Sequence, residues 1–93
     1  MTYELIPQYD NRNSFYKKAL VRTYEDENAK TWQLLSYNTL VANIVEYKDK
    51  IVFENFGKYS QTTRHQKEFF KQNGLTEKQT KELFKSGKME VLK

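Results

Sequence analysis

The feature that most constrains this chain is the segment 59–74, because its sequence marks both ends of one helix. Ser60 predicts the N-cap, since its hydroxyl can accept a hydrogen bond from a free N–H of the first turn. Gly74 predicts the stop, because glycine enters the left-handed conformation at low cost. Phe69 and Phe70 are the strong apolar anchors of this segment. Such a helix must therefore lie on a larger apolar surface to be stable.

The helical spacing divides the side chains of this helix between two faces. The face expected to point inward carries Thr62, Gln66, Phe69, Phe70 and Asn73. The face expected to point to solvent carries Lys67, Glu68 and Lys71.

The part of the chain before this helix is expected to provide the surface as a sheet. Apolar and polar residues alternate over four stretches, as is typical of half-buried strands: Phe15–Tyr24, Thr31–Tyr37, Leu40–Tyr47 and Ile51–Phe56. In the third stretch the alternation places Leu40, Ala42 and Ile44 opposite Val41, Asn43 and Val45. Short polar connections between the stretches favour an antiparallel meander.

The two ends of the chain leave alternatives open. Residues 1–13 are polar and irregular, and their apolar side chains either add a short edge strand or lie over the core. Thr76 and Gln79 form a capping-box pattern, which predicts a second helix from Glu77 to about Lys85. Residues 89–92 are either an edge strand or a frayed tail.

These elements predict an α+β fold in which a three- to four-stranded antiparallel meander is covered by a central helix, with a second short C-terminal helix. The 93 residues are expected to form a single domain, 1–93. Within it we expect an irregular N-terminal segment, 1–13, a sheet, 14–56, and a helical part, 59–93.

Composition excludes several kinds of site. The chain has no cysteine and one histidine, so neither a thiolate nor a multi-histidine metal site can form within it, and no metal or cofactor is expected. His65 could pair with Ser60, Thr62 or Thr63 as base and nucleophile, but those hydroxyls have helix-capping roles, so we expect no enzyme. The sequence also lacks a long apolar run, so no membrane partner is expected, and a cytoplasmic location fits the absence of cysteine.

Positive charge gathers in the C-terminal part of the chain. Residues 1–57 carry seven Lys and Arg against eight Asp and Glu, whereas residues 58–93 carry nine against four. Such a surface binds nucleic acid or an acidic protein, although lysines are also common on solvent faces of helices. The candidate binding residues are Arg64, His65, Lys67, Lys71, Lys78, Lys81, Lys85 and the strand-end residue Tyr37.

Two short motifs carry a family resemblance. Residues 35–42 read Leu-Ser-Tyr-Asn-Thr-Leu-Val-Ala, and a Tyr-Ser-x-Thr-Thr-Arg-His pattern starts at Tyr59. Together they resemble a recurrent pattern in small, mostly uncharacterised proteins of phages and mobile elements. The polar residues of the two motifs are expected to hold the corner between sheet and helix together: Ser36, Tyr37, Thr39, Ser60, Thr62 and Thr63.

The resemblance implies a genomic setting from which a function follows as an expectation. Small phage proteins without a catalytic site often bind and inhibit host machinery, including CRISPR effectors. We therefore expect a non-enzymatic protein that acts in the cytoplasm of a host cell and binds a nucleic-acid-handling or defence protein there, as an anti-CRISPR protein does. The alternative is direct binding of DNA or RNA through the basic helices. The oligomeric state stays open.

Overall fold

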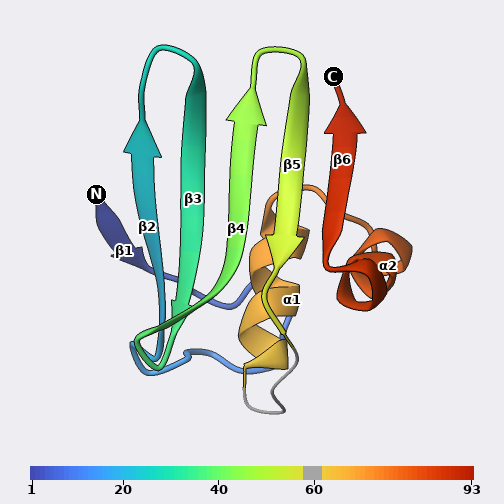
Figure 1. Cartoon of the computed structure of the whole chain (residues 1–93). Coiled ribbons are helices and arrows are strands. Elements are labelled where there is room, and N and C mark those ends of the chain that lie inside the picture. The colour runs from blue at the N-terminus through green and yellow to red at the C-terminus, as the bar shows by residue number, and fades with distance from the viewer. Residues whose placement is uncertain (58–61) are drawn as a thin grey trace.

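A computed structural model, which describes residues 1–57 and 62–93, shows one antiparallel sheet with two helices on the same face (Figure 1). The six strands are β1 (Thr2–Glu4), β2 (Ala19–Glu25), β3 (Ala29–Ser36), β4 (Thr39–Tyr47), β5 (Lys50–Asn55) and β6 (Lys88–Leu92). They lie side by side in chain order. The helices α1 (Thr63–Gln72) and α2 (Glu77–Ser86) are both inserted between β5 and β6.

The expected α+β class and antiparallel meander are confirmed, but the expected count of three to four strands is wrong. The two additional strands lie at the edges of the sheet. Residues 2–4 pair with β2, where Tyr3 lies opposite Val21, and residues 88–92 pair with β5, where Met89 lies opposite Phe53. Both segments are short, so the pairing partner rather than their own pattern decides that they are strands.

The alternation expected in β4 is wrong at its first residues because of a β-bulge. Leu34 lies opposite Ala42, whereas the next residue of β3, Leu35, lies opposite Leu40. Val41 is therefore an additional residue that β3 does not match, and it is buried. As a result Leu40 lies on the opposite face of the sheet from Ala42, and it is exposed.

The hydrophobic core lies between the sheet and the helices. Phe69 and Phe70 of α1 are fully buried, as expected, and their ring centroids are 5.5 Å apart. Phe70 also meets Phe53 of β5 edge to face, at 6.4 Å between centroids. From α2, Leu83 enters the same cluster. The two helices share the cover: α1 packs on β3 and reaches Phe53 of β5, and α2 packs on β5 and β6. The expectation that one central helix covers the sheet is wrong in that respect.

The N-terminal segment contributes to the same core rather than lying outside it. Leu5 and Phe15 are buried within the cluster, and the Leu5 N–H donates to the Ala19 carbonyl at 2.9 Å. The chain between them crosses over α1, which covers the helix on the side away from the sheet. Over the ranges 1–57 and 62–93, no helix is long and apolar enough to cross a membrane.

Candidate binding site around His65

A buried polar junction joins the end of β3 to the start of α1. The Ser36 hydroxyl lies 2.8 Å from Nδ1 of His65 and 3.0 Å from Oγ1 of Thr62. Thr62 is the N-cap residue of α1, but its side chain makes no capping hydrogen bond. Its hydroxyl bonds Ser36 instead, and this contact ties the helix start to the sheet.

The expected N-cap, Ser60, lies outside the described residues, as does Tyr59. Thr63 begins α1, and Thr39 is paired with Ser36 across the β3–β4 hairpin. Thus Ser36 and Thr62 bring the two expected motifs into contact, whereas Thr39 takes part through backbone pairing.

His65 fills the space between two aromatic rings. The Phe15 ring centroid is 4.6 Å from the imidazole centroid, and that of Tyr37 is 5.7 Å away. The side chain is buried, with the residue 4% exposed. Burial lowers the pKa of His65, because the charged imidazolium loses its water; Arg12, Arg64 and Lys18 lower it as well, while Asp10 opposes them.

The contact between Ser36 and His65 has the distance of a nucleophile–base pair but not its surroundings. Ser36 is buried and already bonded to Thr62, so a substrate carbonyl has no access to its oxygen. Asp10, whose charge acts on His65, forms an ion pair with Nε of Arg64 at 3.0 Å. This arrangement orients α1 on the sheet and does not assemble a triad. In the part of the chain that the structure describes, no cluster of three acidic, histidine or cysteine side chains is placed to hold a metal ion.

The imidazole also forms part of the floor of a surface cavity of about 320 Å³, which we call the turn pocket. Its other lining residues are aromatic or cationic: Arg12, Phe15, Tyr16, Lys18, Tyr37 and Arg64. Tyr16 is 73% exposed and Tyr37 is 46% exposed. The pocket is therefore basic and has two accessible phenol rings.

Two strained turns form the rim of the turn pocket. Tyr16 and Lys17 have φ values of 55° and 62°, and Tyr37 and Asn38 have values of 50° and 68°. Two successive residues with positive φ are typical of a type I′ turn, where asparagine and glycine are favoured and tyrosine is unfavourable. The Tyr37 N–H donates to the Lys18 carbonyl at 2.9 Å, so the two turns support each other. Backbone strain of this kind is concentrated at functional sites.

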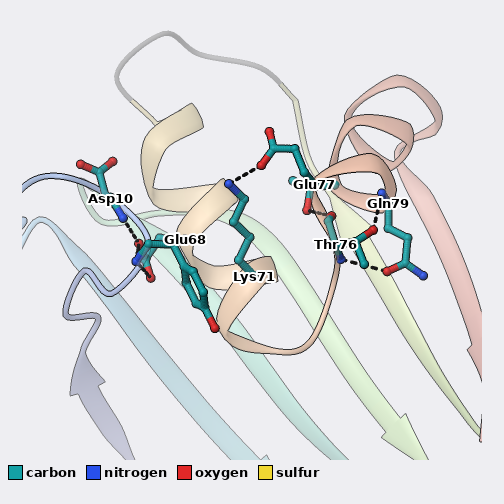
Figure 2. Close-up of polar contacts among 8 residues, drawn as sticks. Asp10, Glu68, Lys71, Thr76, Glu77 and Gln79 are labelled. Carbon is teal, nitrogen blue, oxygen red and sulfur yellow. Dashed lines mark hydrogen bonds and ion pairs between the residues drawn. The ribbon is translucent and has the colours of Figure 1, made fainter.

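A second hollow, of about 330 Å³, lies on the other side of Arg64 and is lined by Asp10, Lys67 and Lys71 among others. The buried carboxylate of Glu68 lies at its base, and the residue is 2% exposed. Its two oxygens accept backbone N–H bonds from Gln8, Tyr9 and Asp10, at 2.9 Å for the shortest bond to each. Figure 2 shows this carboxylate beside Asp10. The prediction that Glu68 points to solvent is wrong, because the N-terminal segment lies over it.

The structure divides the expected binding residues among three places. His65 is buried beneath the turn pocket, while Tyr37 and Arg64 line it. Lys67 and Lys71 line the second hollow, and Lys71 forms an ion pair with Glu77 (Figure 2). The remaining three, Lys78, Lys81 and Lys85, are exposed on α2 and line neither hollow.

Sequence reasoning missed the contribution of the N-terminal segment to this site. Arg12, Tyr16 and Lys18 belong to residues expected to be irregular or to begin a strand. The available signal was the run Phe15-Tyr16-Lys17-Lys18, which combines aromatic and cationic residues just before a strand. Its meaning depends on the fold, because these residues approach the tip of the β3–β4 hairpin only through the pairing of β2 with β3.

The fold and this site define a small α+β protein with a basic, tyrosine-rich surface at one end of its sheet. The model of a family of unknown function, DUF8033, matches residues 3–86, so the chain belongs to this family. No curated protein and no solved structure matches the chain. The family match does not bear on the expected phage origin or on the two sequence motifs.

Proposed function

We propose that this chain is a non-enzymatic binding protein that docks on another protein through its basic face. We define the basic face as the turn pocket together with the adjacent outer surface of α1 at Arg64 and Lys67. The observation that carries the proposal is the pair of exposed tyrosines, Tyr16 and Tyr37, presented on two mutually supported turns. Tyrosine and arginine dominate the energetic centres of protein interfaces, and a rigid backbone lowers the entropy lost on binding.

Charge on this face indicates the kind of partner. Arg12, Lys18 and Arg64 line one pocket, so an acidic protein surface would be complementary to it. A stable complex needs about 800 Å² of surface from each partner, which is within reach of a domain measuring 34 × 29 × 21 Å. The finer proposal is that the partner is a nucleic-acid-handling or defence protein of a host cell that this chain inhibits, as an anti-CRISPR protein would. It rests on the sequence resemblance to phage and mobile-element proteins.

Direct binding of DNA or RNA is the second candidate, because tyrosine rings beside cations can stack bases. An ion pair on α1 weighs against it. Lys71 is paired with Glu77, so this cation is already partly neutralised. Furthermore, Lys78, Lys81 and Lys85 lie outside the turn pocket and extend the positive charge over α2 instead.

Two charge-reversal variants separate these candidates. Arg12→Glu with Lys18→Glu changes the turn pocket, and Lys78→Glu with Lys85→Glu makes the same change in net charge on α2. We expect the first variant to abolish capture of the partner from a nuclease-treated cell extract, and the second to leave it unchanged. Mixed-sequence oligonucleotides should bind the wild-type chain only weakly at about 150 mM salt.

The opposite pattern would overturn the proposal. Nucleic-acid binding through a distributed basic surface releases counterions, so the logarithm of the affinity would fall steeply with the logarithm of the salt concentration. Both variants would then reduce the slope by a similar amount, since each removes two cations. Sub-micromolar oligonucleotide binding at physiological salt, weakened equally by both variants, would assign the basic face to nucleic acid.

A further inference from the structure

Among residues 1–57 and 62–93, no helix lies against one face of the sheet, and we call it the open face. Both helices lie behind the sheet in Figure 1, and the N-terminal segment joins the core on that same side. The strand registers place one polar row across the middle of the open face, in the order Arg22, Gln33, Asn43 and Glu54 from β2 to β5. The Arg22 guanidinium donates to Gln33 Oε1 at 2.9 Å, and Asn43 Nδ2 donates to Glu54 Oε1 at 3.2 Å.

Mainly apolar side chains flank this polar row on both sides along the strands. Towards the β3–β4 hairpin, the cross-strand row consists of Leu20, Leu35 and Leu40. Towards the opposite end of the strands, the row consists of Tyr24, Thr31, Val45 and Val52. Leu40 is 37% exposed and Tyr24 is 51% exposed. An uncovered sheet face normally carries polar residues, so two apolar rows indicate a surface that another layer covers.

The charges of the polar row identify that layer. A twofold axis that runs parallel to the strands, between β3 and β4, would place β2 of one copy over β5 of the other. Arg22 of each copy would then face Glu54 of its partner, and Gln33 would face Asn43. A twofold axis along the row instead would put Arg22 over Arg22 and Glu54 over Glu54. The charge pattern is thus complementary to itself under one symmetry only.

The flanking rows obey the same symmetry. Leu35 would lie over Leu40, Tyr24 over Val52 and Thr31 over Val45, so no charged side chain of these rows meets an apolar one. Packing of two sheets face to face at about 10 Å leaves room for such side chains to interdigitate. The molecule is 21 Å thick in its shortest dimension and 34 × 29 Å in the other two, which matches a sheet with a single helix layer and a broad open face.

We propose that two copies of this chain form a twofold-symmetric dimer through their open faces, with Arg22 and Glu54 paired between subunits. The dimer is a four-layer assembly with both helix layers outside. Because the turn pocket lies against α1, on the other side of the sheet, the dimer leaves both basic faces accessible. It would therefore bind a partner bivalently, which raises the apparent affinity without new contacts.

Charge swapping tests the proposal by sedimentation equilibrium. Arg22→Glu puts two carboxylates opposite each other twice per dimer, and Glu54→Arg does the same with two guanidiniums. Each variant alone should associate at least roughly tenfold more weakly than the wild-type chain, since like charges in an interface are strongly unfavourable. An equimolar mixture of the two variants should recover a dimer, because every carboxylate then faces a guanidinium. The double variant, Arg22→Glu with Glu54→Arg, should also recover it.

Two controls keep this test decisive. Lys81→Glu changes the net charge as much as Arg22→Glu does but lies exposed on α2, so it should leave self-association unchanged. Thr31→Lys introduces a charge beside the proposed axis and should dissociate the dimer. It provides an independent test if circular dichroism shows that a charge-swap variant folds poorly. A wild-type chain that stays monomeric at millimolar concentration would overturn the proposal and leave the open face to a different protein. A wild-type dimer that is insensitive to Arg22→Glu and Glu54→Arg would overturn it too.

Discussion

The two helices have the same length but are held in different ways. Helix α2 carries its own end signals. At its start the Thr76 hydroxyl accepts from the Gln79 N–H, and the Gln79 side chain accepts from the Thr76 N–H (Figure 2). At its end Gly87 adopts a left-handed conformation. In helix α1, the side chain of the N-cap residue Thr62 makes no capping hydrogen bond. The polar side chains of α1 instead bond distant parts of the chain.

The inner side of α1 shows how these distant bonds replace local ones. His65 bonds Ser36 of β3, Gln66 donates to the Val41 carbonyl of β4 at 3.1 Å, and Glu68 accepts from the N-terminal segment. All three side chains are buried. Helix α2 buries only Thr80 among its polar side chains, and the hydroxyl bonds within its own first turn. Thus α1 is specified by tertiary contacts, and α2 mainly by its sequence.

The largest expected effect on stability comes from removing a core ring from α1. Phe70→Ala should lower the free energy of unfolding by about 4 kcal/mol, because the ring is fully buried and contacts three other rings. Leu83→Ala in α2 should cost less, about 3 kcal/mol, since a smaller side chain is lost. Urea denaturation measures both. If Phe70→Ala costs less than 1 kcal/mol, the packing of α1 described above is wrong.

The next effect concerns the carboxylate beneath the N-terminal segment. Glu68→Gln should cost about 2 kcal/mol, because an amide NH₂ would replace an oxygen that accepts backbone N–H bonds. Hydrogen exchange at Gln8, Tyr9 and Asp10 should accelerate more than exchange in the sheet. Glu82→Gln is the matched control, since Glu82 is exposed on α2, and it should change stability by less than about 0.5 kcal/mol. Equal costs for the two variants would contradict the role assigned to Glu68.

His65 should cause a smaller effect, a loss of folding stability at acidic pH. Burial lowers the pKa of His65 in the folded state, so the unfolded chain binds more protons below its own pKa of about 6.5. Stability should therefore fall as the pH drops below about 6.5, by at most about 1.4 kcal/mol per pH unit for this one group. His65 is the only histidine of the chain, so His65→Asn isolates its share. Identical pH profiles for the wild-type chain and this variant between pH 5 and 7 would contradict the prediction.

The smallest effect on stability should come from removing the N-cap hydroxyl of α2. Thr76→Ala removes the hydroxyl that accepts from Gln79 and should cost about 1 kcal/mol, the usual value for an N-cap. Thr76→Ser keeps the hydroxyl and should cost much less. Thermal unfolding followed by circular dichroism measures the difference. If the two variants cost the same, methyl packing rather than capping explains the effect.

The contrast between α1 and α2 also explains which helix boundaries the sequence predicted correctly. The second helix was predicted to within one residue, because Thr76, Gln79 and Gly87 act locally. The start of α1 was predicted at Ser60, but the helix begins at Thr63, since Thr62 bonds Ser36 across the sheet–helix corner. No local pattern reveals a partner 26 residues away.

The same limit applies to the candidate site. Tyr37 and Arg64 were named from the sequence and line the turn pocket, whereas Arg12, Tyr16 and Lys18 were not. Residues in an irregular segment carry no periodicity, so their position depends on what the fold brings beside them. The burial of His65 and Glu68 was missed for the same reason, because the segment that covers them precedes α1 by about fifty residues.

We propose that the strained turns present their tyrosine rings to a partner. Tyr37→Asn tests it most directly, because asparagine tolerates the positive φ of this position and the substitution removes only the ring. The stability of the variant should stay within about 0.5 kcal/mol of the wild type or rise, while capture of the partner falls at least roughly tenfold, as for an interface hot spot. Asn38→Gly, which relieves strain in the same turn and keeps the ring, should raise stability and leave capture unchanged. A Tyr37→Asn variant that captures the partner normally, or that loses about 2 kcal/mol or more of stability, would show that the ring is architectural and contradict the claim.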